Sequence, residues 1–319
     1  MSHTTDFVFP DPLIPPLADN AYLIPLIADV TGADRSSVAE RLRREHLHCP
    51  LSVSEAFYAK GLEPYTWSQE LLDFYEETDC FIYGIVAWNR TEIKCTMRRW
   101  MLDFLHRHRL TRGRILICGD GIGIDSFYFA QAGYDVVFYE VSRYGQQLAR
   151  RMFDDYKGNV QLADSLEMFE PESFDVIFSL DVLEHVPSPP EMVCELSALL
   201  RPGGFFVVSA PFYAVHPQWP THLNCNRKYS GRTAWLSDAG RMKLIDGCPF
   251  ANPLAFQKTC SNHEEMFTLP LGKRLSLGLG GLFLRFSAVF PAVILNTALL
   301  MYRRDSQLKR LMPSQDPQG

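Results

Sequence analysis

The sequence predicts an α/β protein with a doubly wound, mainly parallel sheet, preceded and followed by further helices. Two observations support this prediction. An apolar stretch at 114–118 runs directly into alternate glycines at Gly119, Gly121 and Gly123. Apolar strand-like segments and helix-like segments then alternate along the chain to about residue 210, which is the pattern of parallel strands joined by helices.

The glycine turn indicates a ligand on the backbone. A strand that turns at once into a helix needs residues that adopt positive φ, and a ligand on that turn needs backbone without Cβ atoms in its way. The dinucleotide fingerprint G-x-G-x-x-G would require glycine at 124, where the chain has Ile124. A nicotinamide or flavin ligand is therefore disfavoured.

The segments after the turn predict the rest of the sheet. The second strand ends in Glu140, about 20 residues beyond the turn, where a carboxylate is placed to accept the two hydroxyls of a ribose. The fourth strand is continuously apolar, as expected for a strand covered on both faces. The predicted elements are a helix at 125–132, strands at 134–140, 159–162 and 174–180, a helix at 190–200 and a strand at 205–210.

These motifs together resemble the class I S-adenosylmethionine (SAM)-dependent methyltransferases of the small-molecule type, including the quinone-pathway enzymes. The resemblance covers residues 110–258 and rests on the glycine turn, on Asp181-Val-Leu-Glu-His-Val186 and on Leu200-Arg-Pro-Gly-Gly-Phe205. It implies a Rossmann-like sheet of seven strands, SAM as cofactor and methyl transfer to a small organic acceptor. The residues it implies for the cofactor are Gly119, Asp120, Gly121, Gly123, Glu140, Asp164, Ser165 and Leu180.

One position departs from the family pattern. The family usually has an acidic residue two positions before the first glycine, where it helps to hold the amino-acid end of the cofactor, and this chain has Ile117 there. Asp120, inside the turn, is placed to contact the ammonium group instead. The departure keeps a second hypothesis open, a non-catalytic protein on the same fold that docks a partner or a membrane through its C-terminal segment.

Two histidines are the candidates for a general base. In a doubly wound sheet the acceptor lies at the carboxyl ends of the strands, so the loops after the fourth and fifth strands carry the candidates. His222 is the first choice for a base or an orienting group and His185 the second, because a histidine titrates near neutral pH. A structural role as a loop-pinning polar residue is an equal alternative for both. We predict no metal site, since His216, His222 and Cys225 match no common ligand spacing.

The net charge, the cysteine spacing and the first thirty residues limit the expected partners and location of the protein. The net charge of −6 argues against a nucleic-acid substrate, which would need a basic stripe. The 8 cysteines include no C-x-x-C pair, and the first thirty residues lack the pattern of a signal peptide, so we expect a reduced, cytoplasmic protein.

Residues 1–109 form a separate predicted unit. Met1 to Pro25 is proline-rich and predicts an extended arm, and the helices that follow are expected to close over the cofactor and shape the acceptor pocket. Six aromatic residues are candidate pocket walls, with ordinary core packing as the alternative for each: Tyr65, Trp67, Tyr75, Phe81, Tyr83 and Trp88.

Residues 259–319 form the third predicted unit. The stretch 275–302 carries a single charge, Arg285, and is long enough to span a bilayer, but Gly278, Gly280, Gly281 and Pro291 divide it into two shorter pieces. We therefore expect two apolar helices that cover the acceptor pocket, join a second subunit or lie on a membrane surface, and a hydrophobic acceptor if they contact lipid. A membrane anchor remains the alternative.

Overall fold

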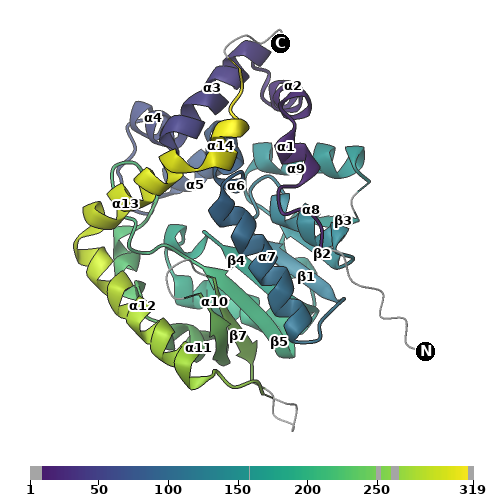
Figure 1. The fold of residues 1–319 in the computed structure, drawn as a ribbon, viewed down its shortest axis with the longest axis vertical. Coiled ribbons are helices and arrows are strands. Elements are labelled where there is room, and N and C mark those ends of the chain that lie inside the picture. Colours follow the sequence, from purple (N-terminus) through teal and green to yellow (C-terminus); the bar gives the residue numbers. More distant parts are fainter. Residues whose placement is uncertain (1–8, 158, 249–252, 260–265, 315–319) are drawn as a thin grey trace.

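A seven-stranded sheet with the order β3-β2-β1-β4-β5-β7-β6 forms the centre of the molecule. The computed structural model describes residues 9–157, 159–248, 253–259 and 266–314 (Figure 1). Strands β1 to β5 are parallel, and β7 runs antiparallel to both of its neighbours. The strands are β1 (Arg114–Cys118), β2 (Asp135–Tyr139), β3 (Val160–Ala163), β4 (Phe174–Leu180), β5 (Leu200–Ser209), β6 (Met242–Gly247) and β7 (Leu254–Lys258).

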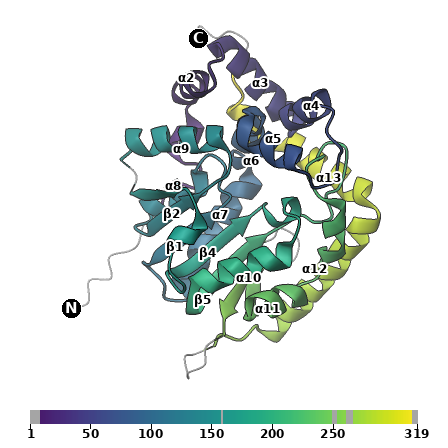
Figure 2. The same cartoon turned by 180° about the vertical axis from the view of Figure 1, so that it is seen from behind.

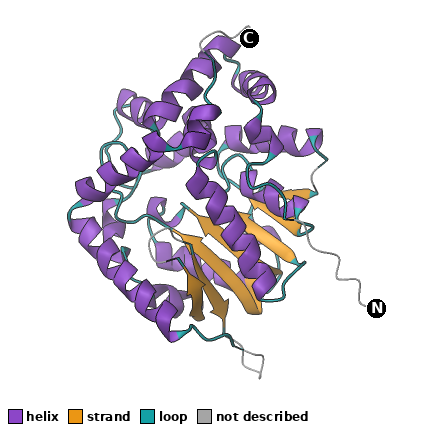
Figure 3. Ribbon diagram, in the orientation of Figure 1, coloured by secondary structure: helices purple, strands orange, loops and turns teal. Residues whose placement is uncertain are grey.

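Helices cover both faces of this sheet because successive side chains of each strand point to opposite faces (Figure 3). In β1, Ile115 and Ile117 pack under one helical layer, and Leu116 and Cys118 pack under the other. The first layer contains α7 (Glu92–Arg107), α8 (Ile124–Gln131) and α9 (Arg143–Asp155); the second contains α10 (Pro189–Leu199) and α11 (Ala234–Gly240), as Figure 2 shows from behind.

The seven-stranded sheet that the resemblance implied is confirmed, and the five strands that the sequence located lie close to their predicted positions. One difference is at β5, which begins at Leu200 rather than at 205. The Arg-Pro-Gly-Gly run, which we expected between the end of the preceding helix and the strand, is the irregular start of this strand, with a register shift against β4 between Phe174 and Val176.

The N-terminal unit is helical from Pro15 onward, so the prediction of an extended arm is wrong for residues 15–25. Pro15 and Pro16 begin a short helix, where their missing N–H groups cost nothing, and Pro25 lies inside the next one. That helix buries Leu23, Leu26 and Ile27, which offsets the loss of one hydrogen bond. The helices are α1 (Pro15–Ala18), α2 (Asn20–Thr31), α3 (Arg35–His48), α4 (Leu51–Ala59), α5 (Gln69–Glu77) and α6 (Cys80–Asn89).

The C-terminal unit contains α12 (Leu271–Val289), α13 (Pro291–Arg304) and α14 (Ser306–Arg310). The break falls at Phe290 and Pro291, whereas the three glycines that we expected to divide the segment lie inside α12. Among the described residues, none of the helices combines the length and the apolar character that crossing a bilayer requires. Figure 1 shows α12 and α13 running along one side of the sheet up to the N-terminal helices.

Candidate functional site

The glycine turn after β1 adopts the conformation that its sequence predicted. Gly119, Gly121 and Gly123 have φ values of +77°, +62° and +80°. At Gly119 and Gly121, neighbouring side chains also leave no room for a Cβ atom. A Cβ on Gly119 would collide with the Val182 side chain, and a Cβ on Gly121 would lie 2.7 Å from Cδ1 of Ile85, a residue of α6. The N-terminal helices therefore close directly over the turn.

Asp120, inside the turn, caps the following helix. Its carboxylate accepts hydrogen bonds from the backbone N–H groups of Asp125 (3.0 Å) and Ser126 (2.7 Å), at the start of α8. Burial and the nearby charge of Asp125 raise the pKa of Asp120 to about 7. Ile117 is buried in the core under the first helical layer, so the side chain two positions before Gly119 contributes packing and no charge.

Glu140, one residue beyond β2, holds the turn from the other side. Its Oε2 accepts from the N–H of Gly121 (2.7 Å), and its Oε1 accepts from the N–H groups of Val141 (2.8 Å) and Ser142 (2.9 Å). Burial raises the pKa of this carboxyl. Since Oε1 already accepts two bonds, Oε2 has the free acceptor capacity for a further hydroxyl.

The other predicted cofactor residues lie along the same edge of the sheet. Asp164 is exposed just after β3, and Ser165 uses its hydroxyl to accept from the N–H of Glu167 (3.1 Å). Leu180 is buried at the end of β4.

A charge network that sequence reasoning did not find links α6 and α7 to the loop after β4. Asp181, in the left-handed region at φ +58°, accepts from Nε1 of Trp88 (3.1 Å) and from Nζ of Lys94 (3.3 Å). Lys94 also lies 3.9 Å from Asp125, which accepts from Nε of Arg98 (2.7 Å). The network is missed because a sequence pattern does not indicate which face of α7 turns toward the sheet.

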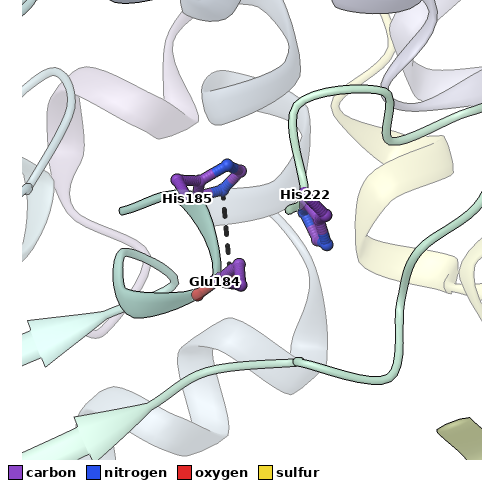
Figure 4. Close-up of side chains that lie close together, drawn as sticks. All are labelled: Glu184, His185 and His222. Atoms are coloured by element: carbon purple, nitrogen blue, oxygen red, sulfur yellow. Dashed lines mark ion pairs between the residues drawn. The ribbon is translucent and has the colours of Figure 1, made fainter. Parts of the chain in front are cut away.

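Glu184, His185 and His222 come together beside this network (Figure 4). Their ligand atoms all lie within 4.8 Å of one another. Glu184 and His185 lie in the short helix η2 (Leu183–His185) after β4, and His222 lies in the loop that follows β5. The rings of the two histidines are perpendicular with centroids 4.6 Å apart. The two histidines that the sequence nominated are thus neighbours, and Glu184 is the third member.

Hydrogen bonds define the state of His185. Its Nδ1 lies 3.2 Å from the carbonyl oxygen of Thr221 and 2.7 Å from the hydroxyl of Tyr75, one of the predicted aromatic wall residues. Because a carbonyl only accepts, we assign the hydrogen to Nδ1, which leaves the lone pair on Nε2, 3.7 Å from Oε1 of Glu184. Burial lowers the pKa of His185 to about 4, so the ring is neutral near pH 7.

The other two members have buried polar atoms without hydrogen bonds. Both carboxylate oxygens of Glu184 and Nδ1 of His222 are inaccessible and have no hydrogen-bond partner among the described residues. Burial, then the charge of Asp181, raises the pKa of Glu184 well above its ordinary value, and burial, then His185, lowers the pKa of His222 well below its own. Neutral imidazoles and an unpaired carboxyl form a donor set that fits a divalent metal ion.

The remaining candidates fall elsewhere. Cys225 is exposed, so the set of His216, His222 and Cys225 that sequence spacing excluded is not the one that the fold assembles. Among the aromatic candidates, Tyr75 and Trp88 reach the loop after β4, and Phe81 stacks on Tyr75. Trp67 is exposed, while Tyr83 is buried under the guanidinium of Arg41.

A cavity of about 280 Å³ lies between the sheet and α12. Its wall is mainly apolar and includes Leu183, which precedes the Glu184 cluster, Val208 of β5 and Leu277 of α12. Three arginine residues, Arg232, Arg274 and Arg285, contribute to its lining. The cavity therefore suits a ligand with an apolar body.

Comparison with known proteins agrees with this geometry. Residues 90–245 match the family described as "Methyltransferase domain". The ubiquinone biosynthesis O-methyltransferase of Xanthomonas euvesicatoria pv. vesicatoria (strain 85-10) is 29% identical over 156 residues, which cover 42% of this chain and 64% of the relative. The corresponding enzyme of Paraburkholderia phymatum is 34% identical over 124 residues, which cover 37% of this chain and 51% of the relative. This chain thus spans less than two thirds of the length of either relative.

Among solved structures, the chain is similar to the Burkholderia thailandensis 1,6-didemethyltoxoflavin-N1-methyltransferase. The TM-score is 0.41 and the identity 19%, over 54% of this chain and 81% of that one.

Proposed function

We propose that this chain is a class I SAM-dependent methyltransferase and that it transfers the methyl group of SAM to a hydroxyl of a small acceptor with an apolar body. The name of the curated relatives, O-methyltransferases, supports oxygen as the methylated atom. The apolar cavity beside Leu183 supports the apolar body.

The cofactor half of the site is the glycine turn. In this proposal Gly119, Gly121 and Gly123 carry SAM on their backbone, and Oε2 of Glu140 accepts from a ribose hydroxyl. Asp164 and Ser165 lie where the adenine is expected, Leu180 lines the same edge, and Asp120 faces the ammonium group. The three hydrogen bonds that Glu140 accepts from backbone N–H groups support its place, since they hold it against the turn without any ligand.

The acceptor half is the cluster of Glu184, His185 and His222. Methyl transfer is an in-line displacement at an activated methyl carbon, so the protein must align the hydroxyl, exclude water and remove its proton. A divalent metal ion held by the three side chains would lower the pKa of an acceptor hydroxyl. His222, neutral and unpaired at Nδ1, keeps its predicted role as the group that orients the acceptor or takes its proton.

The observation that carries the proposal is the position of this cluster. It lies at the carboxyl ends of β4 and β5, in the same sheet edge as the glycine turn, where ligands of doubly wound sheets bind. The absence of C-x-x-C spacing among the cysteines supports a reducing, cytoplasmic location. Residues 275–302 are proposed to contact a membrane surface or a second copy of the chain.

Titration calorimetry tests the cofactor half. We expect SAM and its demethylated product to bind to the full chain with micromolar affinity. Failure of both to bind at high micromolar concentration would overturn the enzyme proposal. Binding without methyl transfer to any hydroxylated apolar acceptor would favour the scaffolding hypothesis instead.

Turnover of His222→Ala across pH tests the acceptor half. We expect turnover to fall at least tenfold, as is usual when a positioned acid or base is removed. Unchanged turnover at every pH would exclude His222 from the reaction.

A further inference from the structure

Large apolar side chains gather on the outer face of α12 and the end of α13. Among the described residues, more than half of the exposed large hydrophobic side chains lie here, although these helices make up a small part of the chain. Several are more than half exposed, such as Leu279 at 65%. We call this set the apolar face: Leu271, Leu275, Leu279, Leu282, Phe283, Phe286, Val289, Phe290, Leu300 and Met301.

The residues of α12 form one continuous stripe because they recur every three or four positions, the spacing of one helix face. The opposite side of α12 is fixed to the protein. Gly281 approaches Gly231 so closely that a Cβ on Gly281 would lie 2.8 Å from the Gly231 carbonyl oxygen. Ser230 donates to the carbonyl of Leu284 (2.7 Å). The stripe is therefore held outward by the packing of the helix.

Only positive charges accompany the apolar face. Residues 266–304 contain five basic residues and no Asp or Glu, in a chain whose net charge is −6. Lys273 pairs with Asp246 on the body side of α12. The other four are exposed: Arg274, Arg285, Arg303 and Arg304.

We propose that the apolar face docks on an anionic phospholipid surface. An amphipathic helix with an apolar stripe and basic flanks lies in the interface of a bilayer, with its basic groups at the headgroup phosphates. Arg274 and Arg285 are eleven positions apart, about three helical turns, so both lie along the same edge of the stripe. A second copy of the chain would bring the same positive charges against each other, which disfavours a symmetric dimer through this face.

Docking would place the acceptor cavity next to the lipid. Leu277 and Leu284 line the cavity on the body side of α12, so one helix separates the cavity from the bilayer surface. An apolar acceptor dissolved in the membrane would then have a short path to Leu183 and the Glu184 cluster. This route rests on the proposed function, whereas the docking itself does not depend on SAM or on methyl transfer.

Co-sedimentation of the full chain with vesicles tests the docking. We expect binding to phosphatidylcholine vesicles that contain phosphatidylglycerol, at least tenfold weaker binding to pure phosphatidylcholine, and a loss of affinity as salt is raised. Leu279→Glu and Phe286→Glu should each weaken vesicle binding at least tenfold, since each places a charge in the exposed stripe that the lipid would cover. Met168→Glu is the matched control. Met168 is exposed to a similar extent (56%), but it follows β3, at the edge of the sheet opposite to β6, which α12 contacts.

The charge contribution has its own pair of variants. Arg303→Glu together with Arg304→Glu should weaken binding to the anionic vesicles at least tenfold, while Arg150→Glu on α9, also exposed, should leave it unchanged. The proposal would be overturned if the wild-type chain did not bind anionic vesicles, or if Leu279→Glu bound them as tightly as the wild type. It would also be overturned if the wild type formed a dimer in sedimentation velocity that Leu279→Glu dissociates, while the wild type bound no vesicles. Calorimetry with SAM on the same variants distinguishes a failure of the docking proposal from a failure of the methyltransferase proposal. Variants that bind SAM as the wild type does but show no difference in vesicle binding would overturn only the docking.

Discussion

The two halves of the sheet edge differ in how their buried carboxylates are satisfied. Beside β1 and β2, Asp120 and Glu140 accept backbone hydrogen bonds, and Asp125 pairs with Arg98. After β4, both oxygens of Glu184 are buried with no hydrogen-bond partner, and so is Nδ1 of His222. The glycine turn is thus complete by itself, while the Glu184 cluster is complete only with a further group.

The difference has an energetic meaning. Burying a polar group without a hydrogen bond costs about 1–3 kcal/mol in proteins, and an unpaired charge costs more. Burial and the charge of Asp181 raise the pKa of Glu184, so its surroundings disfavour the charged form when no cation is bound. If the Glu184 cluster binds a further group, substitutions there should change ligand binding more than stability, whereas substitutions of Glu140 should change both.

The largest effect is expected from Glu184→Gln. This change preserves shape but removes the negative charge that a metal ion requires, so the affinity for Zn²⁺ or Mn²⁺ in calorimetry should fall about a hundredfold or more. The free energy of unfolding should change by less than about 1 kcal/mol, because no hydrogen bond is lost.

Glu45→Gln is the matched control for this variant. Glu45 is also a buried glutamate, but it accepts from the N–H groups of Leu51 (3.1 Å) and Ser52. It should lose stability and keep metal affinity. Metal binding by Glu184→Gln at the wild-type level would show that the cluster binds no metal through this carboxylate.

Glu140→Ala tests the complete half. We expect SAM to bind at least tenfold more weakly, because a charge-assisted acceptor for ribose is removed. Unlike Glu184→Gln, it should also lower the free energy of unfolding by about 2 kcal/mol, since three backbone N–H groups lose their acceptor. Chemical denaturation measures the second effect.

Asp164→Ala is the companion variant. Asp164 is exposed, so its removal should weaken SAM binding while stability stays within about 0.5 kcal/mol of the wild type. An unchanged SAM affinity in Glu140→Ala would mean that the ribose lies elsewhere.

Gly121→Ala tests whether the N-terminal helices close over the turn. Alanine at φ +62° is strained by about 1–2 kcal/mol, and its Cβ would also meet Ile85 at 2.7 Å. Gly133→Ala carries a similar strain at φ +88° with nothing within 4 Å. We expect Gly121→Ala to be less stable than Gly133→Ala by about 1 kcal/mol, the usual cost of overpacking. When Ile85→Ala is present in both variants, this difference should disappear. Equal losses in the two variants would contradict the contact with α6.

The parts of the fold and of the candidate site that the sequence predicted are those set by local patterns. The turn, the strands and the place of Glu140 follow from glycine positions and apolar periodicity within about thirty residues of one another. The Glu184 cluster and the neighbouring Asp181 network were only partly predicted. Tyr75, which bonds to His185, and Trp88 and Lys94, which bond to Asp181, come from helices whose packing is set by tertiary contacts.

The errors have the same origin. The sequence analysis predicts that proline and glycine end helices. In the structure, buried apolar side chains keep Pro25 inside α2, and Gly281 lies inside α12, where it allows the close approach to Gly231.

The pH dependence of Asp120→Asn is the expected effect that is most specific to the turn. Burial and Asp125 raise the pKa of Asp120 from 3.8 to about 7 in the folded protein. The proton that the folded state binds therefore stabilises it fully below pH 3.8, and this contribution is lost as the pH rises through about 7. Asparagine still accepts from the N–H of Asp125 but does not titrate, so the free energy of unfolding of wild type relative to Asp120→Asn should fall between pH 4 and pH 7. A difference that stays constant over this range would show that Asp120 is ionised throughout. If Asp120 faces the ammonium group of SAM, that positive charge lowers the pKa of Asp120, and saturating SAM should flatten the pH dependence of the wild type while leaving that of Asp120→Asn unchanged.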